Sequence, residues 1–239
     1  MKTRSVKWGI MAMALLSMAM PFTAKAQDKV EASVGADFVS NYIWRGTDCG
    51  GVSIQPSMGV SYKGLSLTAW GSVGIDKEDA REIDLTLGYN TGGFSVSVTD
   101  YWFSYHKEDG GYTGDYFKYG AHSTVHIFEA TLGYDFGPLA LSWNTYFAGD
   151  DYTKENGDRA YSTYVGISAP FKLGGLDWSV EVGLTPWEGA YANKFNVTNL
   201  TLKAEKEIKF TNSFSLPTFA QVTFNPHTQG AYFVFGVSF

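Results

Sequence analysis

The chain has 239 residues, and its 24 acidic residues outnumber its 18 lysines and arginines, which gives a formal net charge of −6 at pH 7. This acidic balance argues against a nucleic-acid-binding protein, because such proteins carry a basic face. Aromatic residues reach 16% and glycines number 27, whereas prolines number only 7, so the composition indicates an ordered, β-rich protein. The single cysteine, Cys49, excludes an internal disulfide and a multi-thiolate metal site.

The first residues have the composition of a secretory signal peptide. Basic residues precede an uncharged apolar run at 10–20, which is followed by the small-residue motif Ala24-Lys25-Ala26. The apolar run is shorter than the roughly 20 residues that a membrane-spanning helix needs. We therefore expect cleavage before Gln27, which would remove residues 1–26 and leave residues 27–239 as the exported protein.

From residue 30 onward, apolar residues alternate with polar or small ones. In the segment 52–63 every even position is apolar and every odd position is polar or glycine. A β-strand points successive side chains to opposite faces, so such a segment has one apolar face and one polar face. About twelve segments follow this pattern. They are 30–44, 52–63, 65–76, 81–90, 93–106, 122–136, 138–148, 159–172, 176–187, 196–210, 213–225 and 229–239.

The connections between these segments alternate between two classes. Tight turns such as Lys63-Gly64 and Gly174-Gly175 alternate with mostly longer, charged or glycine-rich loops, the longest at 107–121 and 149–158. Short turns at one end and longer loops at the other are typical of transmembrane barrels with an even strand number. The sequence therefore predicts an all-β fold, a transmembrane antiparallel up-and-down β-barrel of about 12 strands with short periplasmic turns and longer outer loops.

Aromatic residues on the apolar parity gather at the strand ends. Near the short turns lie Tyr62, Tyr89, Phe94, Tyr134, Phe136, Phe171, Phe210, Phe214 and Phe239, and near the longer loops lie Tyr42, Trp44, Phe147, Tyr161, Trp187 and Phe224. Two aromatic girdles are what a lipid-facing wall needs. The terminal Phe239 also resembles the signal that the barrel-assembly machinery reads. We therefore expect a protein of the Gram-negative cell outer membrane, surrounded by lipid and lipopolysaccharide.

The polar parity of the same segments would line a lumen. Its candidate pore-lining residues are Asp37, Asn41, Arg45, Gln55, Asp84, Glu129, Asn144, Glu181, Lys203 and Gln221. Twelve strands lie between the eight that side chains fill and the sixteen that leave an open pore, so a narrow polar lumen is expected. Strand counting also predicts a salt bridge between Glu181 and Lys203, and a β-bulge near Thr99 that turns Asp100 inward.

The N-terminal segment carries a family resemblance. The run Asp37-Phe38-Val39-Ser40-Asn41-Tyr42-Ile43-Trp44-Arg45-Gly46, followed by Ser53-Ile54-Gln55-Pro56 and by 65–72, resembles the Gcw_chp (TorF-like) family of Gram-negative outer-membrane proteins. The similarity is clearest over residues 32–105. It implies an outer-membrane barrel over nearly the whole mature chain, and it implies no catalytic residues.

The sequence lacks the spacings that enzymes and cofactor sites use. It has no paired-histidine zinc motif, no Gly-x-Ser-x-Gly elbow and no phosphate-binding or dinucleotide-binding loop, so we expect no enzyme, metal or cofactor. His122 and His126 are interpreted as ordinary residues near an outer rim. Ser123 beside His122 is the only faint sign of a lipid-modifying enzyme, and strand neighbours point to opposite faces.

Two functional hypotheses therefore stay open. The first is a narrow passive channel for small polar or cationic solutes, because carboxylates outnumber basic groups on the lumen face. The second is a non-conducting structural, adhesive or envelope-anchoring barrel that acts through the outer loops 107–121 and 149–158. A lipid-modifying barrel is a distant third hypothesis. None of the three involves nucleic acid.

Overall fold

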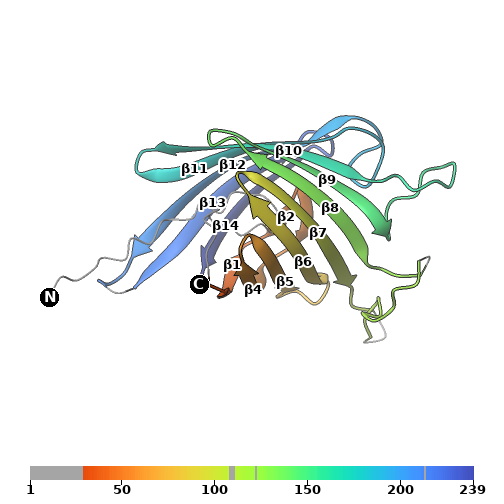
Figure 1. Cartoon of the computed structure of the whole chain (residues 1–239), viewed down its shortest axis with the longest axis horizontal. Helices are drawn as coiled ribbons and strands as arrows, with labels where there is room; N and C mark the ends of the chain where they lie inside the picture. The colour runs from red at the N-terminus through yellow and green to blue at the C-terminus, as the bar shows by residue number, and fades with distance from the viewer. Residues whose placement is uncertain (1–28, 108–110, 122, 213) are drawn as a thin grey trace.

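The computed structural model describes residues 29–107, 111–121, 123–212 and 214–239, which form a closed antiparallel β-barrel (Figure 1). Its wall consists of β1 (Glu31–Val39), β4 (Ser53–Tyr62), β5 (Leu65–Gly74), β6 (Arg81–Thr91), β7 (Phe94–Ser104), β8 (Ile127–Asp135), β9 (Ala140–Gly149), β10 (Thr163–Leu173), β11 (Leu176–Thr185), β12 (Asn196–Lys209), β13 (Ser215–Asn225) and β14 (Gly230–Ser238). The predicted all-β, 12-stranded barrel is confirmed. The described chain contains no helix that could cross a bilayer.

The wall strands pair in chain order, and β1 pairs with β14 to close the ring. Short turns join β4 to β5, β6 to β7 and β10 to β11 at one end of the barrel, which we call the short-turn end. Lys63 and Gly64, for example, both adopt positive φ angles of 50° and 86° between β4 and β5. Two successive positive φ values match the right-handed twist of a tight β-hairpin. The opposite end, which carries the loop between β7 and β8, is the long-loop end.

The barrel wall is apolar outside and polar inside. Leu85 and Val180 point outward and are 38% and 40% exposed, whereas the adjacent Asp84 and Glu181 point inward and are 0% and 5% exposed. A closed ring leaves no strand edge unpaired, which is the condition that hydrocarbon imposes on a spanning sheet. The alternation read from the sequence therefore assigns the two faces of the wall correctly.

At the short-turn end all nine predicted aromatic residues are exposed, as a girdle requires, and Phe239 also borders the lumen cavity. At the long-loop end Phe147, Tyr161, Trp187 and Phe224 are exposed as predicted. Tyr42 and Trp44 are exceptions, and their assignment to this girdle is wrong. The predicted first strand, 30–44, ends at Val39, and the next residues form a separate hairpin inside the barrel.

The predicted bulge near Thr99 is also wrong. The ladder between β6 and β7 is regular there, pairing Thr86 with Thr99 and Leu85 with Asp100, so Asp100 keeps the outward parity. The bulge lies one strand further on, between Phe128 and Glu129. Asp100 is instead covered from outside, because its carboxylate contacts the His126 ring at 2.7 Å and the Tyr119 hydroxyl at 3.4 Å.

The outward orientation of Val180 gives a direct test of the wall. Val180→Arg should lower the free energy of unfolding from lipid vesicles by about 2–4 kcal/mol, the cost of a midplane arginine on the lipid face. Ser57→Arg is the matched control, because Ser57 points into the lumen beside a cavity. Urea unfolding should show a large loss for the first variant and a small one for the second. Equal losses would contradict the orientation of the strands.

Candidate functional site in the barrel lumen

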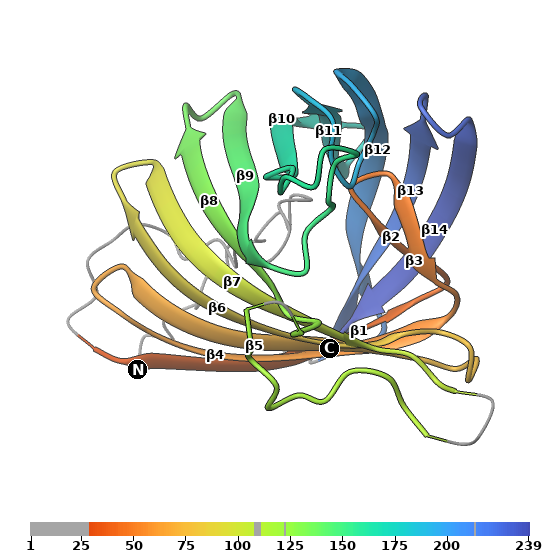
Figure 2. The same cartoon turned by 90° about the vertical axis from the view of Figure 1, so that its right-hand side faces the viewer.

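The segment after β1 folds into the lumen as a hairpin of β2 (Tyr42–Trp44) and β3 (Thr47–Gly50), here called the lumen hairpin (residues 40–51). Figure 2 shows it next to β13 and β14. Arg45 and Gly46 form its two-residue tip, with φ angles of 51° and 79°. Asn-Gly is the usual choice for such a turn. An arginine there costs about 1–2 kcal/mol, so the fold holds Arg45 in place by other contacts.

Gly46 brings the hairpin tip into backbone contact with the wall. A β-carbon at this position would lie only 1.9 Å from the Thr198 carbonyl oxygen, so only glycine allows the approach. The Asn225 side-chain amide donates a hydrogen bond of 3.0 Å to the Gly46 carbonyl. The tip is therefore docked against β12 and β13, and its arginine projects across the lumen.

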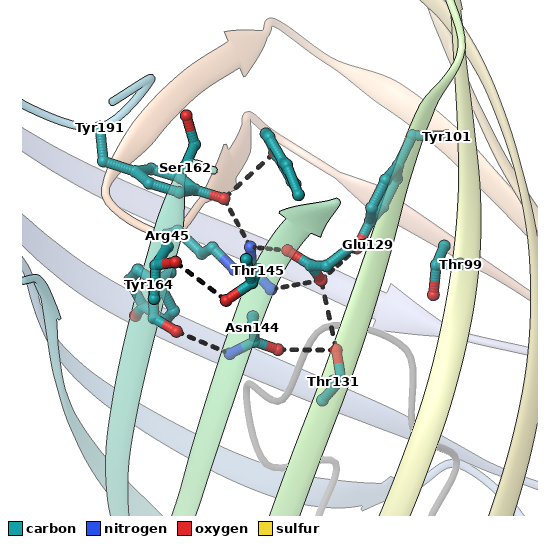
Figure 3. Close-up of polar contacts among 12 residues, drawn as sticks. Arg45, Thr99, Tyr101, Glu129, Thr131, Asn144, Thr145, Ser162, Tyr164 and Tyr191 are labelled. Atoms are coloured by element: carbon teal, nitrogen blue, oxygen red, sulfur yellow. Dashed lines mark hydrogen bonds and ion pairs between the residues drawn. The ribbon is translucent and has the colours of Figure 1, made fainter. Parts of the chain in front are cut away.

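Arg45 forms a buried ion pair with Glu129 on β8, as Figure 3 shows. Its two terminal nitrogens donate to the two carboxylate oxygens at 2.5 and 2.9 Å, and the residues are 6% and 1% exposed. Glu129 also accepts a hydrogen bond of 3.0 Å from the Tyr101 hydroxyl. A bidentate arginine–carboxylate pair is strong and geometrically specific. It fixes the hairpin tip to the wall opposite its backbone contacts.

Aromatic rings surround the guanidinium. Its central carbon lies 4.3 Å from the centre of the Trp44 ring, 4.7 Å from that of Tyr164 and 5.7 Å from that of Tyr191, within the range of cation–π attraction. The Arg45 guanidinium also donates to the Tyr191 hydroxyl at 2.5 Å. Burial raises the pKa of Tyr191 to about 12, although the Arg45 charge opposes the rise, so this hydroxyl stays protonated. It donates onward to Tyr146 at 3.1 Å.

A second polar cluster continues around the lumen from Tyr164. The Tyr164 hydroxyl donates to Glu181 at 2.5 Å, and the Asn199 amide donates to the same carboxylate oxygen at 3.1 Å. The predicted salt bridge between Glu181 and Lys203 is therefore wrong. The ladder between β11 and β12 pairs Glu181 with Thr201 and places Lys203 opposite Ser179.

Lys203 lies beside a cavity between the lumen hairpin and the short-turn half of the wall. The lysine pairs with Glu205 at 2.6 Å and sits 4.3 Å from the centre of the Phe219 ring. The cavity volume is about 410 Å³. Its lining includes Asp37, Gln55, Trp70, Lys203, Glu205, Phe219 and Gln221 from the wall, and Asn41, Tyr42, Trp44 and Arg45 from the hairpin. It is a polar chamber, and the hairpin forms one side of it.

The predicted lumen residues thus separate into groups. Arg45, Glu129 and Asn144 belong to the polar network of Figure 3, in which Asn144 accepts from Thr131 at 2.9 Å. Asp37, Asn41, Gln55, Lys203, Glu181 and Gln221 border the cavity. Asp84 stands apart, because it is fully buried and neither carboxylate oxygen has a hydrogen-bond partner among the described residues.

Sequence reasoning missed the tyrosines of this network. Tyr101, Tyr146 and Tyr164 occupy inward positions of β7, β9 and β10, so the same alternation that found Glu129 could have found them. Tyr191 comes from the loop between β11 and β12, which carries no periodic signal. A tyrosine at an inward-facing, polar position of the alternation indicates a lumen network, because its hydroxyl can bond a polar partner and its ring can face a cation.

The histidines provide no metal site in the described part of the chain. His126 is buried on the outer side of the wall, where its second ring nitrogen contacts the Tyr116 carbonyl at 2.7 Å. No group of three or more potential ligands was found among the described residues. His122, like the predicted signal peptide 1–26, lies outside the described residues.

In comparisons with known proteins, the chain matches solved structures and no family model or curated protein. BamA from Haemophilus ducreyi lacking POTRA domains 1–3 aligns at 11% identity and a TM-score of 0.39, over 81% of this chain and 41% of that chain. CdiB from Acinetobacter baumannii aligns at 13% identity and a TM-score of 0.40, over 90% of this chain and 60% of that chain. The beta domain of the Bordetella autotransporter BrkA aligns at 13% identity and a TM-score of 0.30, over 87% of this chain and 97% of that chain.

Proposed function

We propose that this protein is a Gram-negative outer-membrane barrel that provides a narrow path for small polar solutes, closed by the lumen hairpin. The observation that supports this most is the docking of the Arg45–Gly46 tip across the lumen, next to a polar chamber of about 410 Å³. A barrel with a purely structural lumen would be filled by side chains. This one instead holds an inserted hairpin with a polar chamber beside it.

The membrane setting of the proposal rests on the outer surface. Exposed leucines, valines and isoleucines form a band between rings of exposed aromatic residues, which suits lipid and lipopolysaccharide contact. Phe239 is exposed at the end of the described chain, where the barrel-assembly machinery could recognise it. Membership of the Gcw_chp family and the absence of enzymatic activity stay predictions.

Liposome swelling tests whether solutes pass. We compare wild type with a hairpin-shortened variant, in which residues 41–51 are replaced by a short Gly-Ser linker. The variant should admit small neutral and cationic solutes faster than wild type, because the lumen hairpin no longer crosses their path. Disaccharides and small sugars provide the size series, and empty liposomes provide the baseline. Impermeability of both proteins to every solute would contradict a transport role.

A non-conducting barrel is the second candidate. The loop between β7 and β8 supports it, because this loop presents Phe117 at 89% exposure together with the exposed Tyr112 and Tyr119. Exposed aromatic residues on an outer loop suit adhesion or anchoring to another envelope component. Impermeable liposomes combined with a correctly folded barrel would favour this candidate.

A further inference from the structure

We infer that Glu129 and the tyrosines around it form a binding site for a small organic cation bearing a guanidinium group, and that Arg45 occupies this site in the closed barrel. The inference rests on the proposed function, since it names the class of solute that the path would take. The site lies inside the barrel and is assembled by the wall, and the hairpin contributes its occupant together with one ring, that of Trp44.

The wall presents a complete receptor for a guanidinium. Glu129 is 1% exposed, and one of its oxygens already accepts a hydrogen bond from Tyr101 at 3.0 Å and lies 3.3 Å from the Thr131 hydroxyl. The Tyr101 donor orients the carboxylate so that both oxygens can face a planar cation edge-on. Tyr164 and Tyr191 add ring faces at 4.7 and 5.7 Å from the guanidinium carbon. Three strands, β7, β8 and β10, and one loop therefore converge on one charge.

The geometry favours a guanidinium over a metal ion or a neutral solute. Two parallel N–H donors match the two carboxylate oxygens, at 2.5 and 2.9 Å, in the fork arrangement that a guanidinium provides and an ammonium does not. Aromatic faces attract a weakly hydrated organic cation, because the ring quadrupole replaces part of its hydration. A neutral solute would leave the Glu129 charge buried and uncompensated.

The neighbouring chamber supplies an approach of matching charge. Asp37 borders the cavity and makes no ion pair or side-chain hydrogen bond that the described residues show, and Glu205, paired with Lys203, borders it as well. The chamber also receives the oxygen-bearing side chains of Gln55 and Gln221. Hydrogen-bond acceptors and carboxylates in a chamber raise the local concentration of cations that carry several hydrogen-bond donors. A volume of about 410 Å³ lies within the range of small-molecule pockets.

The conformation of Arg45 is consistent with an internal occupant. Its φ of 51° is uncommon for a residue with a side chain, and the docked state persists because the wall site holds the guanidinium. A free guanidinium at sufficient concentration would compete for Glu129 and release the tip. In the closed barrel, Arg45 of the same chain then occupies the cation-binding site of the lumen.

The test measures binding of methylguanidinium by isothermal titration calorimetry to barrels refolded in detergent. Arg45→Ala and the hairpin-shortened variant should both bind methylguanidinium about tenfold to a hundredfold more tightly than wild type, since the charged hydrogen bonds become available. Adding Glu129→Gln to either variant should abolish the gain. Methylurea, which has the same shape without the charge, should bind none of them.

The controls separate folding and transport from binding. Circular dichroism and heat-dependent gel mobility establish that each variant is folded, and the hairpin-shortened variant leaves the wall site unchanged if Arg45→Ala does not fold. Equal binding of methylguanidinium and methylurea, or binding that ignores Glu129, would overturn the inference. Binding without solute flux in liposomes would uphold the cation site and reject the channel instead.

Discussion

Replacing Glu129 with Gln should lower the free energy of unfolding of the barrel by about 3–5 kcal/mol, the typical result of removing one partner from a buried ion pair. In the docked state the Arg45 guanidinium would be buried between the wall and the hairpin without its counter-charge, which destabilises that state. Urea titration in lipid vesicles, followed by tryptophan fluorescence, measures the loss.

A double-mutant cycle isolates the pair itself. Arg45→Met combined with Glu129→Met removes both charges and keeps apolar volume, so its cost should be much smaller than that of either charge-removing single variant. The coupling free energy between the two positions should be large and favourable. Additive single effects would contradict a direct ion pair between the hairpin and the wall.

Cys49 should react with a thiol reagent about a hundredfold to several thousandfold faster in the Glu129→Gln variant than in wild type. This is the factor expected when 3–5 kcal/mol of docking free energy is lost, at about 1.4 kcal/mol per tenfold. Cys49 lies on β3, and its burial raises the pKa of the thiol, with the Glu82 charge adding to the rise. The docked thiol is therefore mostly protonated and slow to react.

The labelling experiment uses the native cysteine, so wild type needs no added reporter. Thr228→Cys, on the connection between β13 and β14, serves as a reference site whose reactivity should not change with Glu129. Urea-unfolded protein gives the upper limit of the rate. A Cys49 rate that is the same in wild type and in Glu129→Gln would mean that the ion pair does not hold the hairpin in the lumen.

The wall could be predicted from the sequence because, in a closed barrel, residues that alternate with a period of two point to the outer and inner faces in turn. Leu85 and Val180 on one parity and Asp84 and Glu181 on the other follow directly from the alternation. Turn-forming residues, such as Lys63-Gly64 between β4 and β5, mark where the strands end. The closed ring then follows, since an open edge in hydrocarbon would leave backbone groups unpaired.

The lumen hairpin could not be predicted by the same reasoning. Tyr42 and Trp44 continue the alternation of β1, and a periodic pattern does not distinguish a ring facing lipid from a ring facing Trp70 or Tyr101 inside the barrel. The tip Arg45-Gly46 lacks the Asn-Gly or Asp-Gly signature of a two-residue turn. Its geometry depends on the distant partner Glu129, which no local sequence rule reports.

The errors in register have the same origin. Pairing Glu181 with Lys203 requires a register two residues away from the observed one, in which Thr201 faces Glu181 and Lys203 faces Ser179. A single bulge changes every pairing beyond it while leaving the alternation of each strand intact. Sequence periodicity therefore assigns faces reliably and cross-strand partners poorly.

Single-channel recording in planar bilayers tests most directly whether the lumen hairpin closes the barrel. Wild type and the hairpin-shortened variant are recorded under the same salt and voltage, with Leu85→Ala, at an outward-facing position of the wall, as a folded control. We predict that the shortened variant gives stable stepwise currents and that wild type stays mostly closed. Equal currents from the two proteins, or silence from both, would contradict a path that the hairpin closes.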